Sequence, residues 1–506
     1  MTNPDSQYLS LVRGCIETLV EFATDRYGPV HTPLLVSILD VETRHCPADP
    51  DPLDEHYRVT RRGRRSPGGS NLLTDQPLIR AMVALSAVTG DDTYETCAER
   101  YAAYVMRHLV DERGLFWWGW HRHYDVHRDV MDGHNGSPHE IHAIHAIDWD
   151  FLGKVDAAAV RREIEAIWQW HVIDKATGEV NRHGDGRRGC DFSMSAGACI
   201  EAFAFLHGQT ADPVWLERAG LLADYYWHRR NPATDLVPDR PNAGRDRFDG
   251  CSFLTSTTGL HCHSLLRAYE MTGAAVFRDY AAAYLKAYAH YGYDAGSGRF
   301  WGALRMNGTP VGGPRVYTDR LDSADGYAAS QPRGHLDLWG PYVAGYQHPI
   351  FTAQAYVHAY HLTGAPELLT AARRFAAWIA RTPPGTVETD TAWYRDWSRG
   401  PGRQGTYADK YARTVSFLLH LFVVTAEWPF LDDARAMAAE AVARLHHEGL
   451  FRGHPAKPYY EAVDGVGRLL YALVQLDGVL ADPGGAVGAR RILLGPRRVA
   501  LSLENW

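Results

Sequence analysis

The stretch "AYEMTGAAVFRDYAAAYLKAYA", residues 268 to 289, holds two helical patterns joined by Thr272 and Gly273. Apolar residues recur at spacings of three and four on both sides of the glycine, and glycine commonly ends a helix. The stretch therefore predicts a helical hairpin. The same design recurs in "ALSAVTGDDTYETCAERYAAYV" from residue 84 and "AYHLTGAPELLTAARRFAAWIA" from 359, and more loosely in "AFLHGQTADPVWLERAGLLADYY" from 204 and "LFVVTAEWPFLDDARAMAAEAV" from 421.

Hairpins that recur along a chain form either an open solenoid or a closed ring of paired helices. Here the spacing between copies is irregular, and long loops rich in Gly, Trp, Arg and His intervene, as between residues 298 and 349. This favours a mainly α fold, a closed α/α barrel with its functional loops and minor β structure gathered at one end. No composition shift requires a second domain, so we expect a single barrel domain over residues 1–506.

Composition and charge narrow the function classes. The net charge is -8 and the sequence pI is about 6.4, so nothing indicates a nucleic-acid partner, which would need a clustered basic footprint. No apolar run approaches the roughly 20 residues of a membrane helix. The first residues, "MTNPDSQYLSLVRGCIETLV", lack the basic start, apolar run and cleavage site of an export signal. We therefore expect a cytoplasmic protein without a membrane partner; the oligomeric state is not readable.

Residues 116–129, "FWWGWHRHYDVHRD", combine aromatic rings with metal-type ligands. They follow a predicted helix and belong to a loop at a barrel end. The tryptophans at 117, 118 and 120 are either core residues or flat platforms for sugar rings. His121, His123 and His127 alternate, so only some of them face the same way if the segment is extended.

Two further segments carry candidate ligands. In "GSPHEIHAIHAIDWDF", residues 136–151, a Ser-Pro start and an isoleucine stripe predict a helix with Glu140 in its first turn. That helix would place His139, His142 and His145 on one face. Arg182 and His183 lie in a loop after another predicted helix. Two histidines and one carboxylate from three loops suit a divalent ion with open positions; alternatively, the histidines hydrogen-bond one another or the backbone.

The region resembles the pectate lyases of polysaccharide lyase family 2. The resemblance rests on "SNLLTDQPLIRAMVALSAVTGD" from residue 70, "GLFWWGWHRHYD" from 114, "HE" at 139–140 and "RHG" at 182–184, with weaker similarity from about residue 25 to about residue 410. It implies an α/α barrel of about seven helical hairpins that cleaves α-1,4-linked galacturonate by β-elimination. It also implies His121, Glu140 and His183 as ligands of a divalent metal, typically manganese, and Arg182 as the Brønsted base.

The residues suit this chemistry. β-Elimination removes the C5 proton of a uronate, which becomes acidic only when the neighbouring carboxylate is neutralised, and a metal does this as a Lewis acid. Arginine is an unusual base because its reference pKa exceeds about 12, although a nearby dication disfavours the charged guanidinium. If arginine does not serve, His123, His139 or Tyr124 are the fallback bases, and Arg182 would clamp the carboxylate.

Other side chains are candidates for binding an acidic oligosaccharide or polysaccharide. The alternative for each is a core position, a surface charge or a salt bridge; among the cations Arg413 is the strongest, because "YARTVSF" resembles a family segment. The set comprises Trp118, Trp120, Arg122, His139, Arg333, Lys410 and Arg413, and Arg315 and Arg320 are further basic candidates. Trp120 stands where the family has a second glycine, and a family lysine near the mouth is missing. These departures weaken the prediction that pectate is the substrate more than the prediction of β-elimination at a uronate.

Three other functions stay open. An α/α-barrel glycoside hydrolase would need two carboxyl groups about 5 to 9.5 Å apart, and Asp191 and Glu461 are candidates. An isomerase or epimerase would use His261, His263 or His348 as bases. A noncatalytic oligosaccharide-binding relative would keep only the aromatic platforms. The residues favour a metal-dependent lyase of uronate-containing glycans, similar to enzymes of pectate and oligogalacturonate.

Overall fold

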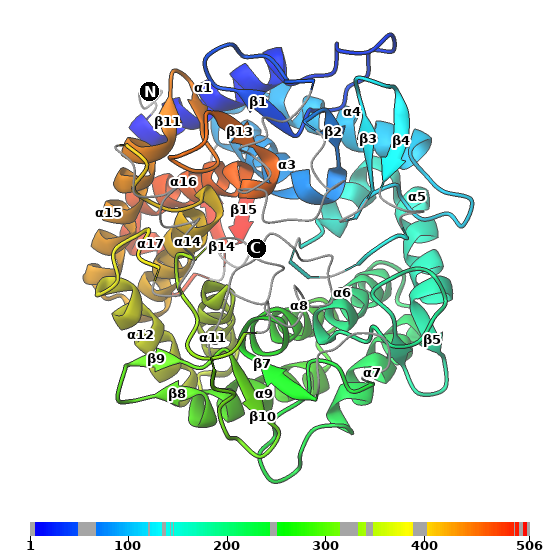
Figure 1. Cartoon of the computed structure of the whole chain (residues 1–506), viewed down its shortest axis with the longest axis vertical. Helices are drawn as coiled ribbons and strands as arrows, with labels where there is room; N and C mark the ends of the chain where they lie inside the picture. Colours follow the sequence, from blue (N-terminus) through cyan, green and yellow to red (C-terminus); the bar gives the residue numbers. More distant parts are fainter. Residues whose placement is uncertain are drawn as a thin grey trace.

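Helices dominate the chain and are arranged as a ring around a central axis (Figure 1). The structure is a computed structural model, and it describes residues 6–48, 67–119, 122–133, 138–141, 143–144, 146–242, 250–313, 332–340, 348–387, 402–489, 491–494 and 499–502.

An inner set of helices is buried on nearly all sides, and such helices belong in the core of a large fold. Neighbours around the ring pack against one another: α3 on α16, α16 on α14, α14 on α11, α11 on η1, and α8 on α6. The inner elements are α3 (Leu72–Thr89), α6 (Ser193–Thr210), the π-helix η1 (Leu254–His261) with its continuation α8 (Cys262–Thr272), α11 (Pro349–Thr363), α14 (Ala408–Thr425) and α16 (Val466–Ala481).

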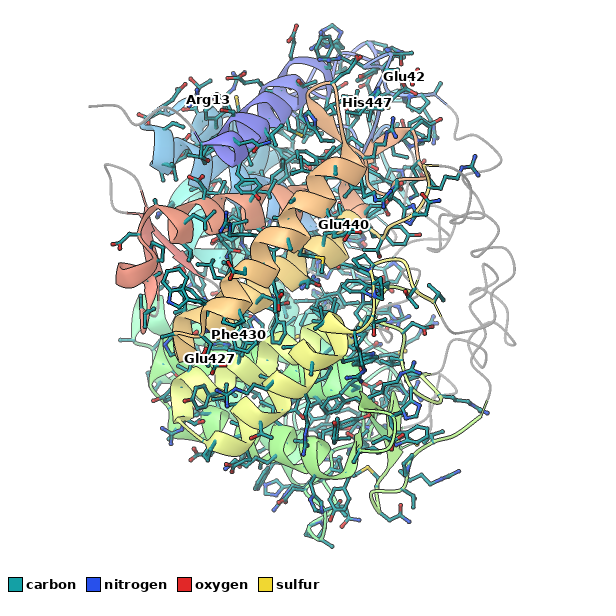
Figure 2. The ribbon with its side chains drawn as sticks, turned by 90° about the vertical axis from the view of Figure 1, so that its left-hand side faces the viewer. Arg13, Glu42, Glu427, Phe430, Glu440 and His447 are labelled. Atoms are coloured by element: carbon teal, nitrogen blue, oxygen red, sulfur yellow. The ribbon has the colours of Figure 1, made fainter. Side chains whose placement is uncertain are left out.

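An outer set of helices buries one face and exposes the other. In α12 (Pro366–Ala380), for example, Leu368, Ala371 and Phe375 are buried at helical spacing. Figure 2 looks onto α15 (Trp428–Leu445), with Glu427 at its start and Glu440 near its other end. The remaining outer helices are α1 (Gln7–Phe22), α4 (Thr93–His108), α5 (Trp149–His171), α7 (Pro213–Trp227) and α9 (Ala275–Tyr291). The predicted α/α barrel is confirmed; that it forms one domain stays a prediction.

All five predicted hairpins join an inner helix to an outer one through the same turn. The residue after the inner helix has left-handed backbone, and it is glycine at 90, 273 and 364 but alanine at 211 and 426. The preceding threonine donates its hydroxyl to the carbonyl four residues earlier and accepts the N–H two residues later, as Thr272 does from Ala274 at 3.2 Å. The turn therefore satisfies groups that a helix end leaves without partners.

The strands form small antiparallel sheets. The β14–β15 hairpin packs against the inner helices α16 and α3 (Figure 1). The pairs are β1 (Ile38–Asp40) with β13 (Tyr459–Glu461), β5 (Val172–Asp174) with β6 (Glu179–Val180), β7 (Cys251–Phe253) with β10 (Ala303–Arg305), β8 (Tyr293–Asp294) with β9 (Arg299–Phe300), β11 (His446–His447) with β12 (Leu450–Phe451), and β14 (Arg491–Leu494) with β15 (Val499–Ser502). β2 (Gly69–Ser70), β3 (Arg122–Asp125) and β4 (Val130–Gly133) form a three-stranded sheet, while η2 (Ala462–Asp464) and α17 (Pro483–Ala486) are short helical turns. None of the described helices has the length and hydropathy to cross a membrane.

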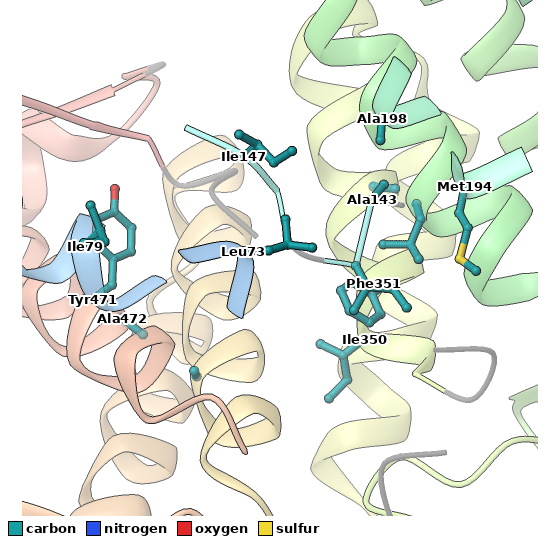
Figure 3. Packing of buried hydrophobic residues seen from close by; sticks show 14 of the residues in the cluster. Leu73, Ile79, Ala143, Ile147, Met194, Ala198, Ile350, Phe351, Tyr471 and Ala472 are labelled. Atoms are coloured by element: carbon teal, nitrogen blue, oxygen red, sulfur yellow. The ribbon is translucent and has the colours of Figure 1, made fainter. Parts of the chain in front are cut away.

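The prediction of a helix that begins near residue 137 is wrong. The described residues between 138 and 148 are not helical, because their backbone groups bond to distant parts of the chain. Ala143 N–H donates to Met194 O of α6 at 3.2 Å, and Asp148 N–H donates to the side chain of Gln76 of α3 at 3.0 Å. Figure 3 shows Ala143 next to Met194 of α6, the residue that accepts its backbone hydrogen bond. The segment thus links two inner helices and closes the ring between them.

Candidate active site

Two extended segments pair at this link and bring the predicted site residues together. Glu140 and His183 face each other in an antiparallel bridge. On either side, Ile141 N–H donates to Arg182 O at 3.1 Å, and Gly184 N–H donates to His139 O at 2.8 Å. The backbone therefore fixes the spacing of Glu140, Arg182 and His183.

The side chains of these three residues converge. Oε1 of Glu140 lies 2.7 Å from Nε2 of His183. Nε of Arg182 lies 3.2 Å from the same histidine nitrogen and 3.6 Å from the same carboxylate oxygen. The Arg182 guanidinium also lies over the Phe192 ring, 4.9 Å from its centroid. A carboxylate, an imidazole and a guanidinium therefore share one small site.

His121, the third expected ligand, and Trp120 lie outside the described residues. Their described neighbours Gly119 and Arg122 are both held by Asn71 at the start of α3, whose side-chain amide donates to their carbonyls at 2.6 and 3.0 Å. Gly119 has a φ of +125°, and a Cβ there would come within 3.2 Å of the Glu140 backbone nitrogen. Glycine is thus required where the tryptophan-rich loop meets Glu140.

The donor set fits a divalent cation. A carboxylate oxygen and an imidazole nitrogen are hard and borderline ligands that manganese, iron or zinc accept together. Neighbouring ligand atoms in an octahedral sphere of about 2.1 Å radius are about 3 Å apart, close to the 2.7 Å between Glu140 and His183. In the described part of the chain, Nδ1 of His183 is buried without a hydrogen bond. Glu140 and His183 could therefore supply two ligands, and a third must come from elsewhere.

A second group of metal-type ligands, which was not predicted from the sequence, lies on the sheet of β3 and β4. His123 and Asp125 of β3 and Asp132 of β4 have ligand atoms within 4.8 Å of one another. Arg128 forms ion pairs with both aspartates, so one guanidinium balances part of their charge. The sequence did contain a signal for this group. Residues two positions apart in a strand lie on the same face, so His123 and Asp125 share a face of β3.

Trp118 and His139 lie behind the site, not at its surface. Trp118 is 1% exposed, and its indole N–H lies 2.6 Å from Nε2 of His139 and 3.0 Å from Oε1 of Glu163. Burial, followed by the charge of Arg122, lowers the pKa of His139 to about 3. Their burial favours the core alternative for Trp118, and substrate binding by Trp118 or His139 stays a prediction.

Three of the expected substrate-binding cations have internal partners. Arg122 pairs with Asp111 at 3.0 Å, and burial lowers its pKa. Lys410 donates to Leu338 O at 3.0 Å. Arg413 pairs with Asp409 at 2.9 Å and lies over a phenylalanine ring. These contacts favour the salt-bridge alternative for Arg122 and Arg413 and a structural role for Lys410. Arg333 is partly exposed and lines a cavity of about 130 Å³, whereas Arg315 and Arg320 lie outside the described residues.

The candidates for other chemistries are also held by internal contacts. Asp191 accepts a hydrogen bond from the Tyr225 hydroxyl at 2.8 Å, and burial raises its pKa to about 6. Glu461 accepts one from Lys457 at 2.7 Å. Burial lowers the pKa of each candidate epimerase base, namely His261, His263 and His348. Of the fallback bases for elimination, Tyr124 lies 3.4 Å from Asp129 and His123 lies on β3.

Comparison with known proteins places the site in a matched region. Residues 54–224 match the family described as periplasmic pectate lyase, and this range contains His121, Glu140, Arg182 and His183. A pectate disaccharide-lyase of Dickeya dadantii is 28% identical over 185 residues, which are 36% of this chain. The alignment covers 32% of that enzyme's own length. The chain thus has a distant, family-level resemblance to pectate lyases over this region.

Solved structures with a similar course of the chain include a family 76 glycoside hydrolase from a Bacteroides thetaiotaomicron strain, at 11% identity and a TM-score of 0.45 over 94% of this chain and 78% of that one. Another is the cellobiose 2-epimerase of Bacillus thermoamylovorans, at 9% identity and a TM-score of 0.47. The similarity covers 93% of this chain and 99% of that one. Likenesses at this level do not bear on the activity of this chain.

The expected cytoplasmic location is contradicted. The family whose model matches residues 54–224 is described as periplasmic. The expectation rested only on the composition of the first printed residues, and these do not establish where a protein works.

Proposed function

We propose that this protein is a divalent-metal-dependent lyase that cleaves uronate-containing oligosaccharides or polysaccharides of the pectate type by β-elimination. The observation that carries the proposal is the convergence of Glu140 Oε1 and His183 Nε2 at 2.7 Å beside the Arg182 guanidinium. The three residues lie within the range that matches the pectate lyase family. The substrate class follows from the names of that family and of the matched pectate disaccharide-lyase.

The proposed reaction balances without an oxidant or reductant. The C5–H bond breaks and its proton moves to the base, the electron pair forms the C4–C5 double bond, and the C4–O bond breaks. The leaving oxygen then takes a proton from a donor or from water. The products are an unsaturated uronate end and a new reducing end.

His121, Glu140 and His183 would hold the metal, manganese by resemblance, and Arg182 would take the C5 proton. When bound, the metal would neutralise the uronate carboxylate, and its charge would disfavour the charged form of the adjacent guanidinium. Arg182 is 8% exposed and stacked on Phe192, so its guanidinium is held at a fixed place with limited access to water. Such restraint suits proton transfer, which needs a positioned group within hydrogen-bond reach.

Ultraviolet absorbance of the protein with polygalacturonate and its short oligomers tests the proposal, first with manganese and then with a chelator. A metal-dependent rise from the conjugated double bond is the expected result. New reducing ends without that rise would replace elimination by hydrolysis. If neither signal appears, glucuronate-containing chains are the next substrates, and inactivity on these as well would overturn the lyase proposal.

A further inference from the structure

A chain of buried polar side chains connects the two segments of the site from behind. Nδ1 of His139 lies 2.8 Å from Nε2 of His171, and Nδ1 of His171 lies 2.8 Å from the carbonyl oxygen of Asn181. At the other end, Nε2 of His139 lies 2.6 Å from the Trp118 indole nitrogen. His139 directly precedes Glu140, and Asn181 directly precedes Arg182. The chain thus ties both halves of the site together through side chains.

The groups at the two ends of this hydrogen-bonded series determine which nitrogen of each histidine carries the proton. An indole N–H only donates, and a carbonyl oxygen only accepts. His171 must therefore carry its proton on Nδ1, facing Asn181 O, so that its Nε2 accepts from His139. His139 then carries its proton on Nδ1 as well, and its Nε2 accepts from Trp118. Oε1 of Glu163 also lies 3.1 Å from Nε2 of His139 and 3.0 Å from the Trp118 indole nitrogen, so this carboxyl is a further partner at that end. With both rings neutral and the Glu163 carboxyl protonated, this arrangement satisfies these contacts as well as those to His171 and Asn181 O.

The hydrogen bond from His171 to Asn181 O restrains the backbone next to Arg182 and His183. Asn181 O is held by His171, Arg182 N–H donates to Cys190 O at 2.9 Å, and Asn181 Oδ1 accepts from His183 N–H at 2.9 Å. The peptide that leads into Arg182 is therefore restrained on both sides. A Cβ at Gly184 would lie 3.1 Å from Nε2 of His171, so the turn after His183 rests directly on the same ring.

We propose that His171 is a positioning residue for Arg182 and His183, held in its neutral Nδ1–H tautomer by the chain Trp118–His139–His171–Asn181 O. It acts through Asn181, since its ring touches that backbone and not the converging atoms of Glu140 and His183. The inference rests on the proposed function, because the placement of Arg182 and His183 matters for turnover only if they form a lyase site.

Two variants and a control separate positioning from general stability. His171→Phe keeps a buried ring but removes both hydrogen bonds. His171→Gln supplies one donor and one acceptor, so it serves as the conservative variant. His420→Phe is the control, because His420 is another buried histidine bonded to a histidine, His361, at 3.1 Å in a different part of the ring.

The kinetic experiment measures kcat and KM on oligogalacturonate, and calorimetry measures the affinity for manganese chloride alone. Residues that orient metal ligands typically change affinity or activity by about 10- to 100-fold, so His171→Phe should lower kcat or manganese affinity by at least about tenfold. KM should stay within about threefold, His171→Gln should recover part of the loss, and His420→Phe should keep near-native values. A folded His171→Phe protein with near-native kcat and manganese affinity would overturn the inference, as would an equal loss in His420→Phe.

A readout independent of turnover is histidine ¹⁵N NMR of the metal-free protein. His139 and His171 should each give a neutral Nδ1–H signal; in His171→Phe the signal of His171 disappears while that of His139 shifts. A neutral Nε2–H signal for His171 would refute the proposed chain even if the protein proves to be a lyase. If the protein shows no lyase activity, the proposed function fails, and the NMR signals and the manganese affinities still decide for or against the positioning role. If His171→Phe does not fold, the wild-type spectrum and His171→Gln carry the test.

Discussion

Glu140 and His183 present a carboxylate oxygen and an imidazole nitrogen 2.7 Å apart, although 43 positions separate them in the sequence. Their backbones form an antiparallel bridge flanked by hydrogen bonds on both sides. The bridge fixes the two backbones next to each other, so the fold itself brings the two donor atoms together. Function at this site therefore depends on the bridge as well as on the donors.

Glu140→Gln should abolish tight metal binding while the protein stays folded. The amide keeps the size of the side chain but removes the negative charge that a divalent cation needs. Because supporting residues alone change affinity by about 10- to 100-fold, loss of a ligand should reduce manganese affinity by at least about 100-fold. Calorimetric titration with manganese chloride measures this, with Glu427→Gln at the surface as the matched control. Unchanged affinity in Glu140→Gln would remove Glu140 from the ligand set.

Arg182→Lys should separate metal binding from turnover. Lysine keeps a positive charge but loses the planar guanidinium that lies 3.2 Å from His183 and over Phe192. We expect manganese affinity within about threefold of wild type and kcat lower by at least about 100-fold, the usual contribution of a general acid or base. Initial rates of double-bond absorbance provide kcat. A lysine variant with near-native kcat would exclude Arg182 as the base.

The ring of hairpins could be predicted from the sequence because its signals are local. Helical periodicity and a threonine before the turn recur in each copy, and the structure has the turn at every predicted place. The helix from residue 137 failed for the opposite reason. Ser137, Pro138 and the isoleucine spacing are local signals, but Ile141 and Ala143 donate to Arg182 and Met194, which are distant in the sequence.

The site was predicted in part. Glu140, Arg182 and His183 came from a family resemblance, and the structure brings these three together. Their support from α5 was missed, although Glu163 and His171 stand among buried apolar residues of that helix. Polar residues on an apolar helical face are a readable signal of a buried network, but their partners are set by tertiary packing, which periodicity does not encode.

Two hairpin turns should become more stable with glycine. Ala211 and Ala426 have φ values of 56° and 59°, where an L-residue costs about 1 to 2 kcal/mol relative to glycine. The greater freedom of glycine in the unfolded chain offsets about 0.4 to 1 kcal/mol of this. Ala426→Gly should therefore raise the free energy of unfolding by about 0.5 kcal/mol, and Ala211→Gly likewise. Chemical denaturation measures the change.

The matched control is Ala436→Gly, an exposed position in the middle of α15 with ordinary helical backbone. Glycine there should lower the free energy of unfolding by about 1 kcal/mol. Destabilisation of similar size at Ala426 would show that the left-handed turn imposes no strain on alanine.

Glu163 should make the protein less stable as the pH rises. Burial raises the pKa of this carboxyl from 4.5 to about 8, so the folded protein holds a proton that the unfolded chain releases above pH 4.5. Stability from this group is fully present below about pH 4.5 and is lost as the pH rises to about 8, with a slope of up to about 1.4 kcal/mol per pH unit. Glu163→Gln mimics the protonated acid and can still accept from Phe116 N–H, which lies 2.6 Å from the carboxyl. Between pH 5 and 8 its free energy of unfolding should fall less steeply than that of wild type, as urea denaturation at a series of pH values would measure. Parallel curves for the two proteins would mean that Glu163 is ionised in the folded state, and the Trp118 indole would then donate to a charged carboxylate.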